Sequence, residues 1–94
     1  MRVQIKIPPF LFQITKGVKL TNVTGNTVGE CLEDFVAQFP PAKKLLFNKD
    51  NKLFGHIEIF LNGVSTFPEE LEKPVHDGDT IFLLYLLSGG WWES

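Results

Sequence analysis

Few residues of this chain are of types that perform catalysis. Its one cysteine, Cys31, could act as a nucleophile, and its two histidines, His56 and His76, could act as bases or zinc ligands. Asp77 and Asp79 flank a glycine and could form a general acid–base pair. However, Cys31 falls in an apolar helical stripe, the histidines lack zinc-ligand spacing, and an Asp-Gly-Asp sequence is typical of a turn. We therefore expect no enzyme activity and no metal site, with Cys31 in the core and both histidines at the surface.

A different feature follows a strongly apolar run near the end of the sequence, where Ser88-Gly89-Gly90 leads into Trp91-Trp92-Glu93-Ser94. Glycine has no Cβ, so a segment with a glycine pair can thread a narrow channel and bring its backbone close to a ligand. A glycine pair alone is more typical of a plain flexible tail. Its interpretation therefore depends on the elements that precede it.

The first half of the chain predicts two strands and one helix. Val3, Ile5 and Ile7 alternate with polar residues and predict a strand that stops at Pro8-Pro9. Residues 10–15 are apolar without alternation, and residues 18–23 predict the return strand of a hairpin with a broad loop. Thr27 and Glu30 have the spacing of a helix capping box. One helical stripe follows and ends before Pro40-Pro41; its members are Val28, Cys31, Leu32, Phe35, Val36 and Phe39.

The second half predicts three strands. After a helical turn at residues 43–47, Ile57–Leu61 reads as a strand that closes on the tight turn Asn62-Gly63. Val64 begins a short return strand, and residues 80–87 form a final apolar strand. The order strand, strand, helix, strand, strand, strand predicts an α+β domain with one main helix on one face of a mixed sheet of about four or five strands.

Length and composition limit the function. With 94 residues, of which 44% are hydrophobic, the chain has material for one core. Its net charge of −2 excludes the uniform positive surface of a dedicated nucleic-acid-binding protein, and no apolar stretch reaches the ~20 residues that span a bilayer. A single cysteine and the absence of an apolar signal segment make the reducing cytoplasm the expected location.

The charges are unevenly distributed. Residues 1–66 carry eight basic and five acidic residues, whereas residues 67–94 carry one basic and six acidic residues. Such an acidic end is either a solvated surface or a face that meets a basic partner.

These motifs occur together in one family. The helix start at Thr27-Val28-Gly29-Glu30, the turns at Asn62-Gly63 and Asp77-Gly78-Asp79, and the apolar strand before Ser88-Gly89-Gly90 resemble the MoaD family, the small sulfur-carrier subunit of molybdopterin synthase. More distantly, the chain is similar to ThiS and ubiquitin. The resemblance covers residues 1–90 and implies a β-grasp, ubiquitin-like fold with a flexible Gly-Gly tail.

The resemblance also implies a function. An adenylating enzyme of the MoeB/ThiF type would activate the carboxylate of Gly90 with Mg-ATP, and sulfur would then replace the adenylate to form a thiocarboxylate. Gly89, Gly90 and Ser88 would form the mobile arm, while Leu84, Leu86 and Leu87 would anchor it against a partner. The sulfur acceptor would be an enzyme such as the large molybdopterin synthase subunit, in molybdopterin or tungstopterin assembly. No resident cofactor, nucleic acid or membrane is implied.

The sequence departs from the family pattern after the second glycine. An amide bond from Gly90 to Trp91 leaves no carboxylate to adenylate. Either a peptidase removes residues 91–94, or this copy has lost the carrier role, or the four residues are an artificial extension, for which a tryptophan pair is unusual. Two tryptophans are large anchors for a recognition pocket, which favours processing between Gly90 and Trp91.

Two other functions stay open. The chain could be a ubiquitin-like modifier that is joined through Gly90 to lysines of other proteins, or a β-grasp interaction module without covalent chemistry.

The alternation of the predicted strands also suggests a partner surface. If Ile59 and Ile81 face the core, Phe60, Phe82 and Leu84 lie on the opposite side of the sheet. We expect them to form an exposed apolar patch with an acidic rim that binds the adenylating enzyme and then the sulfur acceptor. The alternative is a second core layer, covered by residues 10–14.

Overall fold

A computed structural model of the chain describes residues 2–86. Its sheet has five strands in the order β2-β1-β5-β3-β4. The strands are β1 (Val3–Lys6), β2 (Leu20–Val23), β3 (Ile57–Leu61), β4 (Val64–Ser65) and β5 (Thr80–Tyr85). β1 and β5 pair in parallel, and the other neighbouring strands are antiparallel. The predicted mixed sheet and the α+β class are therefore confirmed.

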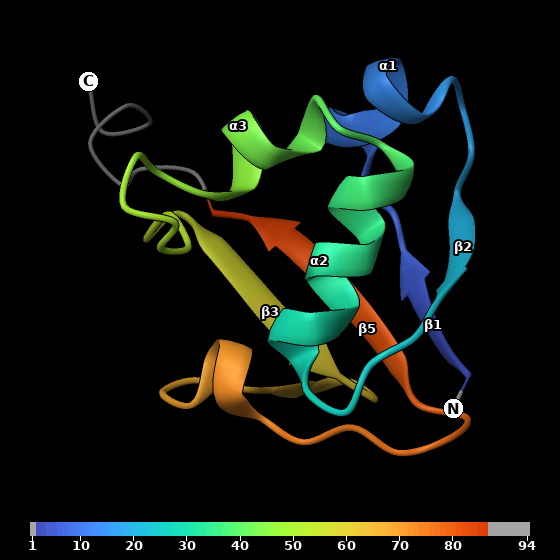
Figure 1. The fold of residues 1–94 in the computed structure, drawn as a ribbon, viewed down its shortest axis with the longest axis vertical. Coiled ribbons are helices and arrows are strands. Elements are labelled where there is room, and N and C mark those ends of the chain that lie inside the picture. The colour runs from blue at the N-terminus through green and yellow to red at the C-terminus, as the bar shows by residue number, and fades with distance from the viewer. Residues whose placement is uncertain (1, 87–94) are drawn as a thin grey trace.

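The main helix, α2 (Val28–Gln38), lies across one face of the sheet (Figure 1). The Thr27 hydroxyl accepts a hydrogen bond from the Glu30 backbone N–H at 3.1 Å, as the capping box predicts. The Glu30 carboxylate accepts a hydrogen bond at 2.7 Å from the backbone N–H of Asn26, one residue before the cap. The first N–H of the helix, on Val28, donates to the carbonyl of Lys73 at 2.9 Å, so η2 (Glu70–Glu72) and the segment after it lie against the helix start.

The core lies between α2 and the sheet. Phe35 is its largest fully buried side chain and belongs to the same core cluster as Ile5, Ile59 and Ile81, which are also inaccessible to solvent. Most of the predicted helix stripe and of the inward strand residues is thus buried, although Val36, Phe39 and Leu61 are only partly covered. Cys31 is fully buried, as expected.

The segment after β1 differs from the predicted broad loop. It folds into η1 (Pro9–Leu11) and the short helix α1 (Phe12–Thr15), which ends at Lys16 in the left-handed region. Leu11 is buried, while Phe10, Phe12 and Ile14 pack on the core cluster. A non-alternating apolar run suits such a short helix because it buries more than one side of the segment.

The connection from α2 to β3 contains α3 (Ala42–Leu46) and a polar loop. β3 turns into β4 through Asn62 and Gly63, both with positive φ (52° and 84°), as the Asn-Gly pair predicts. Among residues 2–86, no helix is long and apolar enough to cross a membrane.

Candidate functional site

The central strand β5 leads to the tail that the sequence singled out. It lies between β1 and β3, and its chain can be followed to Leu86, whose N–H donates to the carbonyl of His56 at 2.6 Å. Five predicted site residues lie outside the described residues: Leu87, Ser88, Gly89, Gly90 and Trp91. The last described residue, Leu86, which the tail follows in the sequence, thus lies at the end of the central strand.

Aromatic rings cluster at this exit point. Tyr85 contacts Phe10 edge-on, with ring centroids 5.1 Å apart, and lies 4.8 Å from the His56 ring. His56 in turn stacks on Phe54 at 5.0 Å. His56 is half-buried, with the Phe54 ring stacked on it and the Tyr85 ring tilted against it, so the prediction of a surface histidine holds only in part there. The prediction is confirmed for His76, whose side chain is 83% exposed. Sequence reasoning missed this cluster; the available signal was the close spacing of Phe54 and His56 just before a strand.

A second apolar feature occupies the sheet face opposite α2. Phe60 and Phe82 are directly paired across β3 and β5, with ring centroids 6.5 Å apart. Both rings are half-buried, and the next outward residue of β5, Leu84, is 37% exposed. The three residues line an open groove of about 590 Å³. We call it the outer-face groove; its remaining lining residues are Lys6, Asn62, Gly63 and Thr80.

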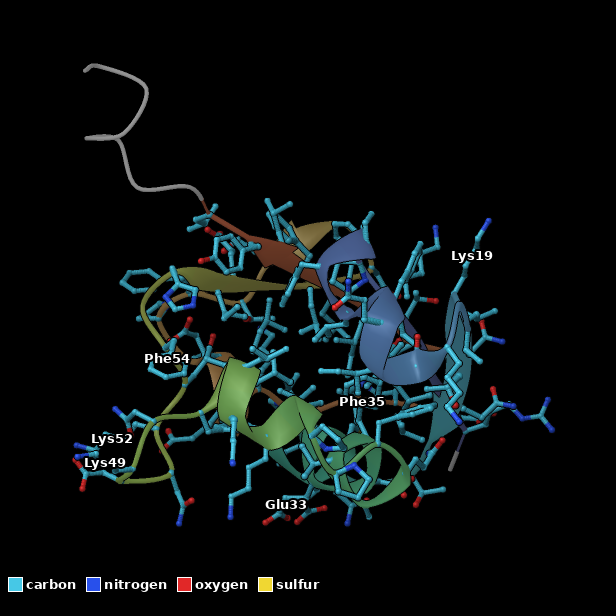
Figure 2. The ribbon with its side chains drawn as sticks, turned by 90° about the horizontal axis from the view of Figure 1, so that it is seen from above. Lys19, Glu33, Phe35, Lys49, Lys52 and Phe54 are labelled. Carbon is cyan, nitrogen blue, oxygen red and sulfur yellow. The ribbon has the colours of Figure 1, made fainter. Side chains whose placement is uncertain are left out.

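The outer-face groove is uncovered in the described part of the chain. Residues 10–14, which could have formed a second core layer there, pack on the core side instead. Figure 2 shows the helices on one side of the sheet. The prediction of an acidic rim is wrong. Lys6 of β1 is the register partner of Phe82, and Glu58 of β3 is the register partner of Leu84, so these two flanking charges are opposite in sign. The parallel pairing of β1 with β5 is what brings the lysine there.

The residues considered for catalysis have structural roles. Burial, followed by the nearby carboxylates of Asp34 and Glu30, raises the pKa of the Cys31 thiol to about 11, which keeps it protonated and unreactive. Asp79 accepts hydrogen bonds from the Asn62 side chain at 2.9 Å and the His76 N–H at 2.7 Å. The Asp77 carboxylate accepts from the Arg2 N–H at 2.8 Å. Within residues 2–86, no group of three metal-binding side chains is found.

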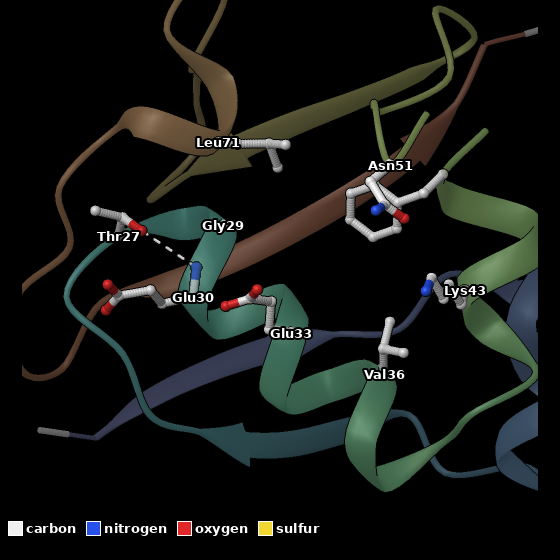
Figure 3. Close-up of a pocket in the computed structure, with 9 residues that line it drawn as sticks. Thr27, Gly29, Glu30, Glu33, Val36, Lys43, Asn51 and Leu71 are labelled. Carbon is white, nitrogen blue, oxygen red and sulfur yellow. Dashed lines mark hydrogen bonds between the residues drawn. The ribbon is translucent and has the colours of Figure 1, made fainter. Parts of the chain in front are cut away.

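A second hollow lies on the helix side and has a volume of about 470 Å³ (Figure 3). Its walls include Glu33 and Val36 from α2, with Lys43 and Leu71 opposite. Gly29 allows η2 to approach, since a Cβ there would lie 3.0 Å from the Leu71 carbonyl oxygen. This hollow contains no arrangement of groups that points to catalysis.

Comparisons with known proteins agree with the fold. No family model matches the chain. The sulfur carrier protein CysO of Mycobacterium tuberculosis is 28% identical over 93 residues, which cover 96% of this chain and 100% of CysO. A solved Amycolatopsis orientalis BexX/CysO complex contains a chain that is 32% identical, with a TM-score of 0.83, covering 94% of this chain and 99% of that one.

Two further solved structures are similar. Small archaeal modifier protein 1 of Methanosarcina acetivorans is 28% identical, with a TM-score of 0.82, covering 95% of this chain and 96% of that one. The complex of subunits 1 and 2 of the Helicobacter pylori molybdopterin-converting factor contains a chain that is 25% identical, with a TM-score of 0.59, covering 96% and 100%. Across nearly its whole length, the chain is thus homologous to CysO, and it belongs to the ubiquitin-like, β-grasp family of sulfur carrier proteins.

Proposed function

We propose that the chain is the precursor of a sulfur carrier that works through a thiocarboxylate at Gly90. Residues 1–90 form the carrier domain with its Gly-Gly tail, and residues 91–94 are an extension that a peptidase removes. The observation that carries the proposal is the homology with a sulfur carrier, combined with a Gly-Gly pair that ends four residues beyond Leu86, the last described residue, which directly follows the central strand.

The chemistry requires a free carboxylate. Hydrolysis of the Gly90–Trp91 amide supplies it. A carboxylate oxygen then attacks the α-phosphate of ATP on the adenylating enzyme, and pyrophosphate leaves. Hydrosulfide from a sulfide donor attacks the carbonyl carbon of the acyl adenylate; a C–S bond forms, the C–O bond to AMP breaks, and loss of the sulfur-bound proton leaves the thiocarboxylate of Gly90. The absence of Cβ atoms at Gly89 and Gly90 suits a narrow channel to the nucleotide.

The outer-face groove is suited to hold the partner during these steps. Phe82 and Leu84 belong to β5, the strand that leads to the tail, so a partner that binds them also holds the tail close to its own active site. Such tethering raises the effective concentration of the reacting group. Two aromatic rings and a leucine, with one charge on either side, match the apolar centre and polar rim of protein interfaces.

Similarity favours one class of sulfur acceptor over another. The chain resembles the CysO complex (TM-score 0.83) more closely than the molybdopterin-converting factor (TM-score 0.59). An acceptor of the kind that binds CysO is therefore favoured over the large subunit of molybdopterin synthase, the acceptor that the family resemblance alone suggested.

A second function has support from one comparison. The similarity to small archaeal modifier protein 1 favours conjugation of Gly90 to lysine amines of other proteins. Activation is the same in both cases, but a lysine amine in place of sulfur attacks the acyl adenylate.

The intact mass of the protein purified from its own cells tests the proposal. A sulfur carrier precursor should yield a species that has lost residues 91–94, and part of it should carry the mass gain of one oxygen-to-sulfur exchange. An alkylating agent should then add one more alkyl group to this species than to the form without the exchange, because the thiocarboxylate sulfur is an additional nucleophile. A chain that keeps residues 91–94 in full would contradict the proposal, and Gly90 isopeptides without any thiocarboxylate would favour the modifier.

A further inference from the structure

A basic groove lies on the helix side of the molecule, near the end of β5. It is formed by α3 and the loop after it and has a volume of about 740 Å³. Phe47 and Phe54 supply its apolar surface, and Lys43, Lys44 and Lys49 supply its positive charge. Among its described lining residues, Asp50 is the only acidic one. We call this feature the lysine groove; it is basic although the whole chain carries a net charge of −2.

The loop that forms the lysine groove is held in place by its own hydrogen bonds. The Asn48 side-chain oxygen accepts from the N–H of Asp50 at 2.8 Å and from that of Lys52 at 3.1 Å. Phe47 and Leu53 form a β-bridge, and the Phe54 N–H donates to the Leu46 carbonyl at 3.0 Å. The groove is therefore a formed feature of the fold that needs no partner to shape it.

The lysine groove is close to the point where the tail leaves the domain. The Phe54 ring in its wall stacks on His56, and the His56 carbonyl accepts the hydrogen bond from Leu86. Trp91 lies five residues beyond Leu86, and five extended residues span at most about 17 Å. Trp91 and the residues after it can thus reach the groove without any change in the folded domain.

The chemistry of the extension matches this groove. Ammonium groups are attracted to the faces of indole rings, and indole rings stack well on phenylalanine rings. A carboxylate such as that of Glu93 pairs with lysine. The outer-face groove, which the tail could also reach, has only Lys6 as a cation among its described lining residues. We propose that, in the uncleaved chain, Trp91-Trp92-Glu93 docks in the lysine groove.

Docking of the extension does not depend on the sulfur-carrier role, and it changes the surface that the protein exposes. Docking holds the Gly90–Trp91 bond against the domain, and removal of residues 91–94 uncovers the three lysines. The uncleaved and cleaved chains then present different surfaces to a partner.

The chain contains its own probe, because its only two tryptophans are Trp91 and Trp92. The fluorescence of the full-length protein is compared with that of a peptide of residues 87–94. Docked indoles should emit at shorter wavelength than those of the peptide, and acrylamide should quench them roughly twofold less, since the groove shields them from water. The same spectrum for protein and peptide would overturn the proposal.

Charge reversal locates the docking site. Replacing Lys44→Glu and Lys49→Glu together should return the emission and the quenching to the values of the peptide. The matched control is Lys16→Glu with Lys19→Glu, which makes the same charge change at two exposed lysines; Lys19 lies on the far side of the molecule from Lys49 and Phe54 (Figure 2). An equal effect of both pairs would indicate only a response to net charge and would overturn the assignment.

Two phenylalanine variants show which of the two grooves holds the extension. Phe54→Ala should increase quenching, whereas Phe60→Ala, in the outer-face groove, should not; far-ultraviolet circular dichroism checks that both variants are folded. A response to Phe60→Ala, with no response to the Lys44 and Lys49 changes, would place the extension on the outer face and refute the proposal. None of these measurements needs an adenylating enzyme, so they can fail independently of the proposed function.

Discussion

The side chain of Asn62 joins the turn between β3 and β4 to Asp79, at the start of β5. Its Nδ2 donates to Asp79 Oδ1 at 2.9 Å, and its Oδ1 accepts from the N–H of Thr80 at 2.9 Å. The Asn62 N–H also donates to the Thr80 carbonyl at 2.8 Å. One asparagine thus fixes the hairpin next to the outer-face groove onto the strand that leads to the tail.

This contact predicts a pH dependence of stability. The hydrogen bond from the Asn62 side chain, together with that from the His76 N–H, lowers the pKa of Asp79 below its usual 3.8. A lowered folded-state pKa means that the contribution of Asp79 is fully present above pH 3.8 and is lost as the pH falls below that value, through the folded-state pKa. Asp79→Asn should therefore destabilise the domain at pH 7, and the difference from the parent protein should shrink in strong acid. Urea unfolding at pH 7 and in strong acid measures this difference in the free energy of unfolding.

Glu33→Gln is the control, because it removes the same negative charge at an exposed position on α2. A difference between Asp79→Asn and the parent protein that does not change with pH would contradict the prediction.

Phe35 should be a main determinant of stability. Its ring is fully buried, and its centroid lies 5.4 Å from the ring centroid of Phe39. Phe35→Ala should lower the free energy of unfolding by about 3–5 kcal/mol, because it removes buried apolar area and leaves a cavity. Phe67→Ala is the matched control: that ring is 73% exposed, and its loss should change stability by no more than about 0.5 kcal/mol. Equal losses for the two variants in chemical denaturation would refute this view of the core.

Adenylation should depend on removal of the extension. A chain that ends at Gly90 should support ATP–pyrophosphate exchange by its adenylating enzyme, whereas the full-length chain should not, because its Gly90 carbonyl is held in an amide. Gly90→Ala in the shorter chain should reduce exchange while the melting temperature stays unchanged, since the added Cβ affects only the confined channel. Exchange at equal rates by both lengths, with mass spectrometry showing residues 91–94 still attached, would exclude this gate. Exchange by neither length would favour an interaction module without covalent chemistry.

The outer-face groove should be needed for binding to the adenylating enzyme. Phe60→Ser removes one of its two rings and should weaken the complex at least tenfold, since central aromatic residues commonly contribute more than about 1.4 kcal/mol to an interface. Phe67→Ser makes the same change at an exposed ring outside the groove and should have no effect. Titration calorimetry with circular dichroism as the folding check makes the comparison. Unchanged affinity of a folded Phe60→Ser variant would rule the groove out as the docking surface.

Much of the fold could be predicted because its signals are local. The helix at residues 28–38 is specified by a capping box and by apolar residues at helical spacing, and the Asn62-Gly63 turn by its tolerance of positive φ. The alternation in β1 and β3 marks which residues face inward. These features depend on residues a few positions apart, so the sequence indicates them directly. The order of its motifs also indicated the family.

The surfaces that surround the tail depended on tertiary structure. Lys6 lies beside Phe82 only because β1 and β5 pair in parallel, across more than seventy residues of chain, and this pairing replaced the expected acidic rim with two opposite charges. His56 is half-buried because the rings of Phe54 and Tyr85 both pack against it. The lysine groove likewise combines a short helix, a loop and a ring that stacks near the end of β5. The sequence by itself determined the elements and the Gly-Gly tail, because backbone hydrogen bonding and side-chain periodicity are local. The charges and aromatic rings near the end of β5 were decided by tertiary structure. They come from segments that are far apart in the sequence, so no local pattern indicates that they lie together.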